Sequence, residues 1–187
     1  MIPTPQRFTP LQRALHWLMA LCILAMLFIG VGMVSTIAPK YLPLVAIHES
    51  LGTVILLLAL IRLAVRWRYG APALPADLPA PMKLAAELSH YILYALMIAM
   101  PLLGWGMLSS ANYPVVLFGG LHLPMILPPS DSLHTLLWNA HFYLALAFFG
   151  LILLHLAAAL FHALIRRDGV FQAMASVSRN DGVAPAE

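Results

Sequence analysis

The chain has 187 residues, of which 62% are hydrophobic and only 9% are charged, and its mean hydropathy is +0.90. Soluble globular proteins carry about a quarter charged residues, so this composition excludes an ordinary soluble domain and indicates an integral membrane protein. The formal net charge is +3. Its cations border the apolar segments, so the charge is explained by membrane topology and predicts no nucleic-acid partner.

Four apolar segments each exceed the roughly 20 residues that a helix needs to cross a bilayer. We expect helices at about 12–35, 44–66, 86–109 and 135–166. The predicted fold class is all-α: an integral membrane four-helix bundle of up-down topology, forming one membrane domain over residues 1–187. The longest connection, at about 110–134, lies between the third and fourth helices.

Orientation follows from the basic residues, because short cytoplasmic loops carry the excess of Lys and Arg. One side of the predicted bundle has nine of the ten: Arg7, Arg13, Arg62, Arg66, Arg68, Lys83, Arg166, Arg167 and Arg179. Only Lys40 lies on the other side. Both termini, the Pro-rich 71–81 linker and the 168–187 tail are therefore predicted to be cytoplasmic. The first apolar run is too long for a typical cleaved signal peptide, so we expect it to be retained. The lone Cys22 excludes an intramolecular disulfide.

A fourteen-residue spacing starts at a histidine in each apolar segment. It relates His16 to Gly30, His48 to Arg62, His90 to Gly104 and His141 to His155. Fourteen residues make just under four helical turns and a rise of about 21 Å, so both members of a pair share one face at two levels. A polar aromatic side chain is costly in hydrocarbon and marks a functional site. Two levels of imidazoles predict sites for two large flat cofactors, and haem is the best candidate.

Depth in the bilayer predicts which histidines share an iron. His16 and His155 lie at similar distances from the cytoplasmic cations, and His48 and His141 lie near the opposite ends of their helices. Each pair can hold one haem, so the fourth helix would carry two haems stacked across the membrane. A haem bound by two imidazoles has no open coordination position, which favours electron transfer over oxygen binding.

Three further residues are candidates for the surroundings of the haems. Arg62 can pair with haem propionates, or it can be a snorkelling cation at the membrane boundary. Gly30 and Gly104 fall at the outer haem level, where they either clear space for a porphyrin or serve close helix packing.

The remaining histidines have several alternatives. His90 and His162 lie towards the cytoplasmic end and can contact a quinone head group, bond a propionate, replace His16 or His155 as a ligand, or simply sit at the interface. His122 and His134, in or beside the 110–134 connection, are expected to be ordinary solvated residues.

Four motifs resemble the bacterial cytochrome b561 family, whose members include the superoxide oxidase type. They are RALHW at 13–17, IHESLG at 47–52, SHYILYALMIAMPLLGWGM at 89–107 and HFYLALAFFGLILLHLAAALFH at 141–162. The resemblance covers all four segments in order. It implies a di-haem b cytochrome of the bacterial inner membrane, with the cytoplasmic haem on His16 and His155 and the periplasmic haem on His48 and His141.

The resemblance also implies a ubiquinone site near the cytoplasmic haem, which maps onto His90 and His162. For the superoxide oxidase type, it implies that superoxide is oxidised to oxygen at the periplasmic haem and that ubiquinone is reduced on the inside. Similar proteins have basic residues in the linker ahead of the third helix. The linker PADLPAPMK has only Lys83, so either Lys83 substitutes or quinone binding is rearranged.

Two other functions compete with superoxide oxidation. A membrane electron-transfer subunit would link a periplasmic dehydrogenase or a small soluble cytochrome to the quinone pool. It would dock through the apolar residues of the 110–134 connection, although we favour a re-entrant or interfacial loop there. A metal-ion or proton transporter is disfavoured because the fourth helix has no embedded carboxylate.

Overall fold

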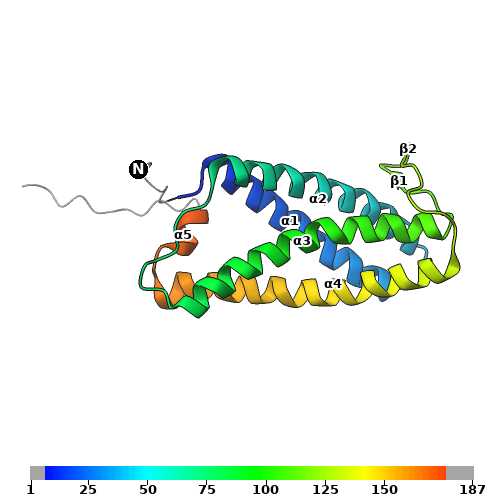
Figure 1. Cartoon of the computed structure of the whole chain (residues 1–187). Helices are drawn as coiled ribbons and strands as arrows, with labels where there is room; N and C mark the ends of the chain where they lie inside the picture. Colours follow the sequence, from blue (N-terminus) through cyan, green and yellow to red (C-terminus); the bar gives the residue numbers. More distant parts are fainter. Residues whose placement is uncertain (1–6, 176–187) are drawn as a thin grey trace, which may run out of the picture.

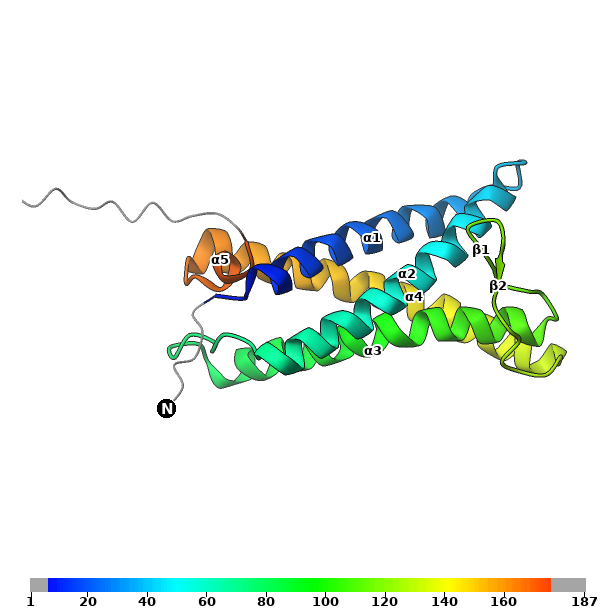
Figure 2. The same ribbon diagram turned by 90° about the horizontal axis from the view of Figure 1, so that it is seen from above.

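The computed structural model describes residues 7–175. Four long helices, α1 (Pro10–Val34), α2 (Tyr41–Tyr69), α3 (Ala80–Ser110) and α4 (Asp131–Leu160), run side by side in alternating directions (Figures 1 and 2). Two short strands, β1 (Val116–Leu117) and β2 (Leu121–His122), form an antiparallel hairpin between α3 and α4. A π-helical turn, η1 (Phe161–Arg166), continues α4 and is followed by α5 (Val170–Met174). Of the predicted 168–187 tail, residues 176–187 lie outside the described residues.

All four long helices are long and apolar enough to cross a membrane. Their outer faces expose large apolar side chains, such as Phe28 at 79% and Leu154 at 64%. Such a surface is unfavourable in water and matches the hydrocarbon of a bilayer. The prediction of an all-α membrane four-helix bundle is therefore confirmed.

Each helix begins before its predicted limit, and at α1 and α4 a capping side chain lies just outside the apolar run. α1 begins at Pro10, and Thr9 and Gln12 form a capping box in which the Thr9 hydroxyl accepts from the Gln12 N–H at 3.2 Å. α3 begins at Ala80 rather than at about 86, directly after Pro79. α4 begins at Asp131 rather than at about 135, where the Ser130 hydroxyl accepts from the Leu133 N–H at 3.3 Å.

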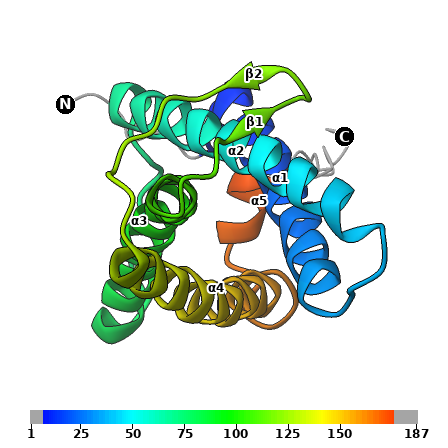
Figure 3. The ribbon, with the colours of Figure 1, turned by 90° about the vertical axis from the view of Figure 1, so that its right-hand side faces the viewer.

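The hairpin lies beside α2 at one end of the bundle, which we call the hairpin end (Figure 3). The Phe118 N–H donates to the Ser50 hydroxyl at 2.9 Å, and the Val116 N–H donates to the Glu49 carboxylate at 3.3 Å. Val115 and Leu117 are buried. These contacts tie the connection to α2. α5 covers the opposite end, the α5 end, where the Trp17 indole N–H donates to the Met174 carbonyl at 3.3 Å.

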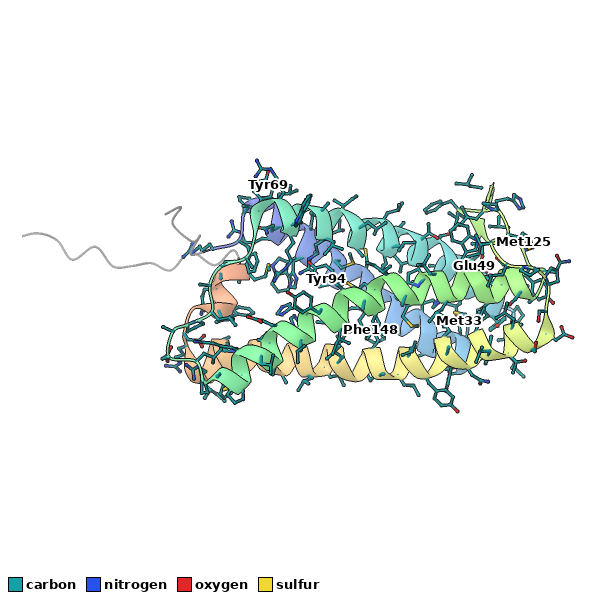
Figure 4. The ribbon with its side chains drawn as sticks, viewed as in Figure 1. Met33, Glu49, Tyr69, Tyr94, Met125 and Phe148 are labelled. Atoms are coloured by element: carbon teal, nitrogen blue, oxygen red, sulfur yellow. The ribbon has the colours of Figure 1, made fainter. Side chains whose placement is uncertain are left out.

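The core of the bundle lies between its two ends. It is a cluster from all four long helices: Met19, Ile55, Ala59, Tyr94, Met97, Met100 and Phe148. Figure 4 shows Tyr94 and Phe148 between the helices. Phe148 lies seven residues from both His141 and His155, so it shares their face of α4 at an intermediate depth.

Replacing Phe148 by alanine is expected to lower the free energy of unfolding by about 3–5 kcal/mol, because it leaves a cavity in the core. Thermal unfolding in detergent, followed by circular dichroism, measures the effect. Phe149→Ala is the matched control, since Phe149 is 45% exposed whereas Phe148 is 9% exposed. Equal destabilisation by both variants would contradict the placement of Phe148 in the core.

Candidate cofactor site

Two histidines of distant helices face each other near the α5 end. The ring centres of His16 on α1 and His155 on α4 are 6.4 Å apart, and their planes are inclined by 61°. We call this pair the inner pair. The fold thus brings together two residues that the sequence predicts to share an iron.

A second pair lies nearer the hairpin end. The ring centres of His48 on α2 and His141 on α4 are 6.1 Å apart with an interplanar angle of 63°. We call this pair the outer pair. The Nδ1 atoms of both rings are buried and have no hydrogen-bond partner among residues 7–175. A buried polar nitrogen without a partner is costly, which favours a ligand for these rings.

Gly104 lies directly against the outer pair. A Cβ atom added at Gly104 would be 3.4 Å from His141 Cε1 and 3.6 Å from its Nδ1. The absence of a side chain on α3 therefore lets this helix approach the imidazole. An added Cβ at Gly30 meets no atom within 4 Å, so a clearance role for Gly30 remains a prediction.

The spacing within each pair suits an iron bound by two imidazoles. A ligating imidazole nitrogen lies about 2 Å from a metal and about 1 Å from its own ring centre, so two rings on opposite sides of one ion have centres about 6 Å apart. Among residues 7–175, no group of three or more His, Cys, Asp or Glu side chains is placed to hold a metal ion. Two imidazoles with four porphyrin nitrogens complete the coordination of haem iron, so these residues fit haem.

Arg62 reaches the inner pair. Its Nη2 donates to His16 Nδ1 at 2.8 Å, and its Cζ lies 5.3 Å from the ring centre of Tyr94, a cation–π contact. A His16 that ligates iron through Nε2 carries its proton on Nδ1 and cannot accept this hydrogen bond. Ligation therefore requires Arg62 to change partner. A haem propionate is the predicted partner, and this role remains a prediction.

The two histidines of the predicted quinone site contact different partners. His90 lies beside the inner pair, with its ring centre 5.4 Å from that of His155, and its Nδ1 donates to the Ala86 carbonyl at 2.6 Å. His162 Nδ1 lies 2.7 Å from the Asp168 carboxylate. Neither Asp168 nor Tyr94 has a role predicted from the sequence. Tyr94 could have been found from its position one turn after His90 on α3.

The two histidines in or beside the 110–134 connection differ in their exposure to solvent. His122 is exposed, as predicted. His134 was predicted to be solvated, and this is wrong: it is partly buried, and its Nδ1 donates to the Met107 carbonyl at 3.0 Å. The reason is that α4 begins earlier than predicted. His134 therefore lies in the first turn of α4 and faces the last turn of α3, where the Met107 carbonyl also accepts from the Ser110 hydroxyl at 2.8 Å.

A membrane bundle with two facing imidazole pairs, on a shared helix and with ring spacings that suit iron, is the arrangement expected of a membrane haem protein. Comparison with known protein families identifies the family to which the chain belongs. The family model described as prokaryotic cytochrome b561 matches residues 7–176, so the chain belongs to this family. It is therefore a membrane electron-transfer protein that binds haem b, and a multi-pass protein of the bacterial inner membrane.

Three relatives match almost the whole chain. Cytochrome b561 homolog 2 of Escherichia coli K12 is 31% identical over 183 residues, which are 95% of this chain and 96% of that protein. Cytochrome b561 homolog 1 of the same strain is 30% identical over 171 residues, covering 90% and 96%. A protein of Yersinia pestis named probable superoxide oxidase CybB is 29% identical, also over 171 residues and with the same coverage.

Proposed function

We propose that this chain holds two haem b groups and moves electrons from superoxide on the periplasmic side to ubiquinone on the cytoplasmic side. The observation that carries the proposal is that two facing imidazole pairs lie at two depths along α4, one at His141 and the other at His155. His48 and His141 would hold the outer haem, and His16 and His155 the inner haem. The name of the Yersinia pestis relative supports superoxide as the donor.

The proposed orientation places the α5 end, with Arg166 and Arg167, in the cytoplasm. Lys40 then lies at the periplasmic end. The hairpin, hydrogen-bonded to Glu49 and Ser50 beside His48, would lie on the same side as the outer pair, while His90 and His162 would lie on the quinone side.

The overall reaction balances with two superoxide ions for each quinone. Each superoxide gives up one electron and leaves as oxygen, and one ubiquinone takes up two electrons and two protons and leaves as ubiquinol. Bound haem supplies the one-electron redox chemistry at each level. The apolar cluster around Phe148 lies between the two levels and would exclude water there. The protons must come from the cytoplasmic side, where His90 and His162 are the candidate donors.

A docking function is the alternative, and the hairpin region provides the observation that favours it. Tyr113, Phe118 and Leu121 are 64%, 74% and 60% exposed at this end of the bundle. Exposed aromatic and apolar side chains can contact either lipid head groups or a periplasmic redox partner. Such a partner would replace superoxide as the electron donor.

Stopped-flow visible spectroscopy of the purified protein, with haem content quantified beforehand, tests the proposal. We expect two haems per chain, rapid reduction on mixing with superoxide, and reoxidation when ubiquinone is added. Superoxide dismutase in the mixing buffer should abolish the reduction. Haems that ignore superoxide but are oxidised by quinone would favour the docking function. Protein purified without haem would contradict both.

A further inference from the structure

The end of α4 contains a compact network of charged side chains. η1 is a π-helical turn, a rare geometry that occurs frequently at functional sites. After it, Arg167 adopts a left-handed conformation with φ 53° and ψ 37°, and its N–H donates to the His162 carbonyl at 2.8 Å. This reversal of the chain returns Asp168 to the side chain of His162.

Asp168 is the centre of this network. Its Oδ2 accepts from His162 Nδ1 at 2.7 Å and from Arg166 Nε at 2.9 Å, and its Oδ1 accepts from the Val170 N–H at 3.3 Å. The Asp168 side chain is 9% exposed and that of His162 is 12% exposed. Burial opposes ionisation of Asp168, but the hydrogen bonds from His162, Arg166 and Val170 outweigh it and lower the pKa of this carboxyl. Asp168 is therefore a carboxylate at neutral pH.

Arg166 connects this network to the linker between α2 and α3. Its Nη2 donates to the Asp77 carboxylate at 2.8 Å. The Asp77 side chain is 76% exposed, and exposed ion pairs contribute little to stability. The main effect of Arg166 is therefore on the buried Asp168, whose charge it balances.

We infer that Asp168 is a positioning residue that holds His162 for proton transfer to the reduced quinone. The inference rests on the proposed function, since it assigns the proton donor of that same site. Because Nδ1 donates to Asp168, Nε2 is the nitrogen of His162 that remains for other chemistry. A carboxylate on Nδ1 also stabilises the protonated imidazolium, as in other carboxylate–histidine pairs.

The proposed proton transfer has two parts, donation of a proton by His162 and its replacement from water. The N–H bond at His162 Nε2 breaks, and an O–H bond forms on a quinone oxygen that has received its electrons through the inner haem. His162 keeps the proton on Nδ1 and becomes neutral, and Nε2 then takes a proton from cytoplasmic water. This accounts for one of the two protons, and the other comes from a separate donor.

Quinone turnover by Asp168 variants tests the inference. The rate of quinol formation is measured against quinone concentration in protein with quantified haem, so that kcat and KM are separated. We expect Asp168→Asn to lower kcat by about 10- to 100-fold at nearly unchanged KM, because the carboxylate no longer supports the imidazolium. Asp168→Glu should recover part of the loss. Asp131→Asn, at the exposed start of α4, is the matched control and should match the parent protein.

A second variant keeps the test decisive if Asp168→Asn does not fold. His162→Gln should lower kcat to a similar extent, and the double variant should be no slower than the slower single variant. The ¹⁵N shifts of His162 should also show a proton on Nδ1 in the parent protein and a changed pattern in Asp168→Asn.

Parent-level kcat in His162→Gln, or in folded Asp168→Asn, would overturn the inference while leaving the proposed function standing. A parent protein whose haems are reduced by superoxide but not reoxidised by quinone would overturn both. A loss seen only in KM would assign Asp168 to quinone binding and overturn the positioning role.

Discussion

Replacing His48 or His141 by alanine is expected to remove the outer haem and to leave the inner haem in place. Replacing His16 or His155 should do the reverse. Haem content should therefore fall by about half in each single variant, because a non-covalently bound haem that keeps only one of its two histidine ligands would be weakly held. The ring spacings of 6.1 Å and 6.4 Å are the basis for these pairings.

The pyridine haemochrome assay gives haem per chain, and low-temperature spectra distinguish which haem remains. The two variants of one pair should leave the same spectrum, and the double variant His48→Ala/His141→Ala should match its single variants. His122→Ala is the control, since His122 is exposed. If folded His48→Ala and His16→Ala lost the same spectral component, the pairing would be wrong. Because His90 lies 5.4 Å from His155, His90→Ala tests whether it replaces a ligand of the inner pair.

Replacing Gly104 by leucine is expected to disrupt the outer haem and spare the inner one. The first added carbon already lies 3.4 Å from His141 Cε1, which is ordinary contact, so Gly104→Ala should be tolerated. The further atoms of leucine compete with the His141 ring for the same space. Because interiors are close-packed, the ring must move, and a ligand moved by even 1 Å no longer fits the iron.

Haem content and the spectrum of the remaining haem measure this effect. Gly150→Leu is the matched control on α4, because Gly150 is exposed and an added Cβ meets nothing within 4 Å. Full haem content in Gly104→Leu would contradict the contact. A loss of the inner haem in that variant would contradict the assignment of Gly104 to the outer level.

Much of the candidate site is predictable from the sequence because a transmembrane helix has a regular rise. Once four spans are located, the number of residues from each end gives the depth of each histidine, and the period of 3.6 gives its face. This reasoning correctly brought His16 to His155 and His48 to His141. It failed at His134, because the start of α4 depends on the capping hydroxyl of Ser130 rather than on hydropathy.

Contacts that depend on lateral packing were not predictable. The depth of Arg62 follows from its spacing from His48, but its hydrogen bond to His16 and its contact with Tyr94 depend on how α1, α2 and α3 pack. The sequence predicts that Arg62 is near a haem level without choosing its partner. The burial of Val115 and Leu117 also depends on the hairpin. Its strands have two residues each, which is too short for an alternating pattern to be recognised in the sequence.

By itself the sequence determined the membrane class, the four spans, the two levels of histidines and the family, because each depends on hydropathy, helical period or local motifs. Only the tertiary structure decided that Gly104 lies against His141, that Arg62 contacts His16 and that Asp168 turns back onto His162. These contacts join residues through helix packing or through a left-handed reversal at Arg167, and neither leaves a periodic signal along the chain.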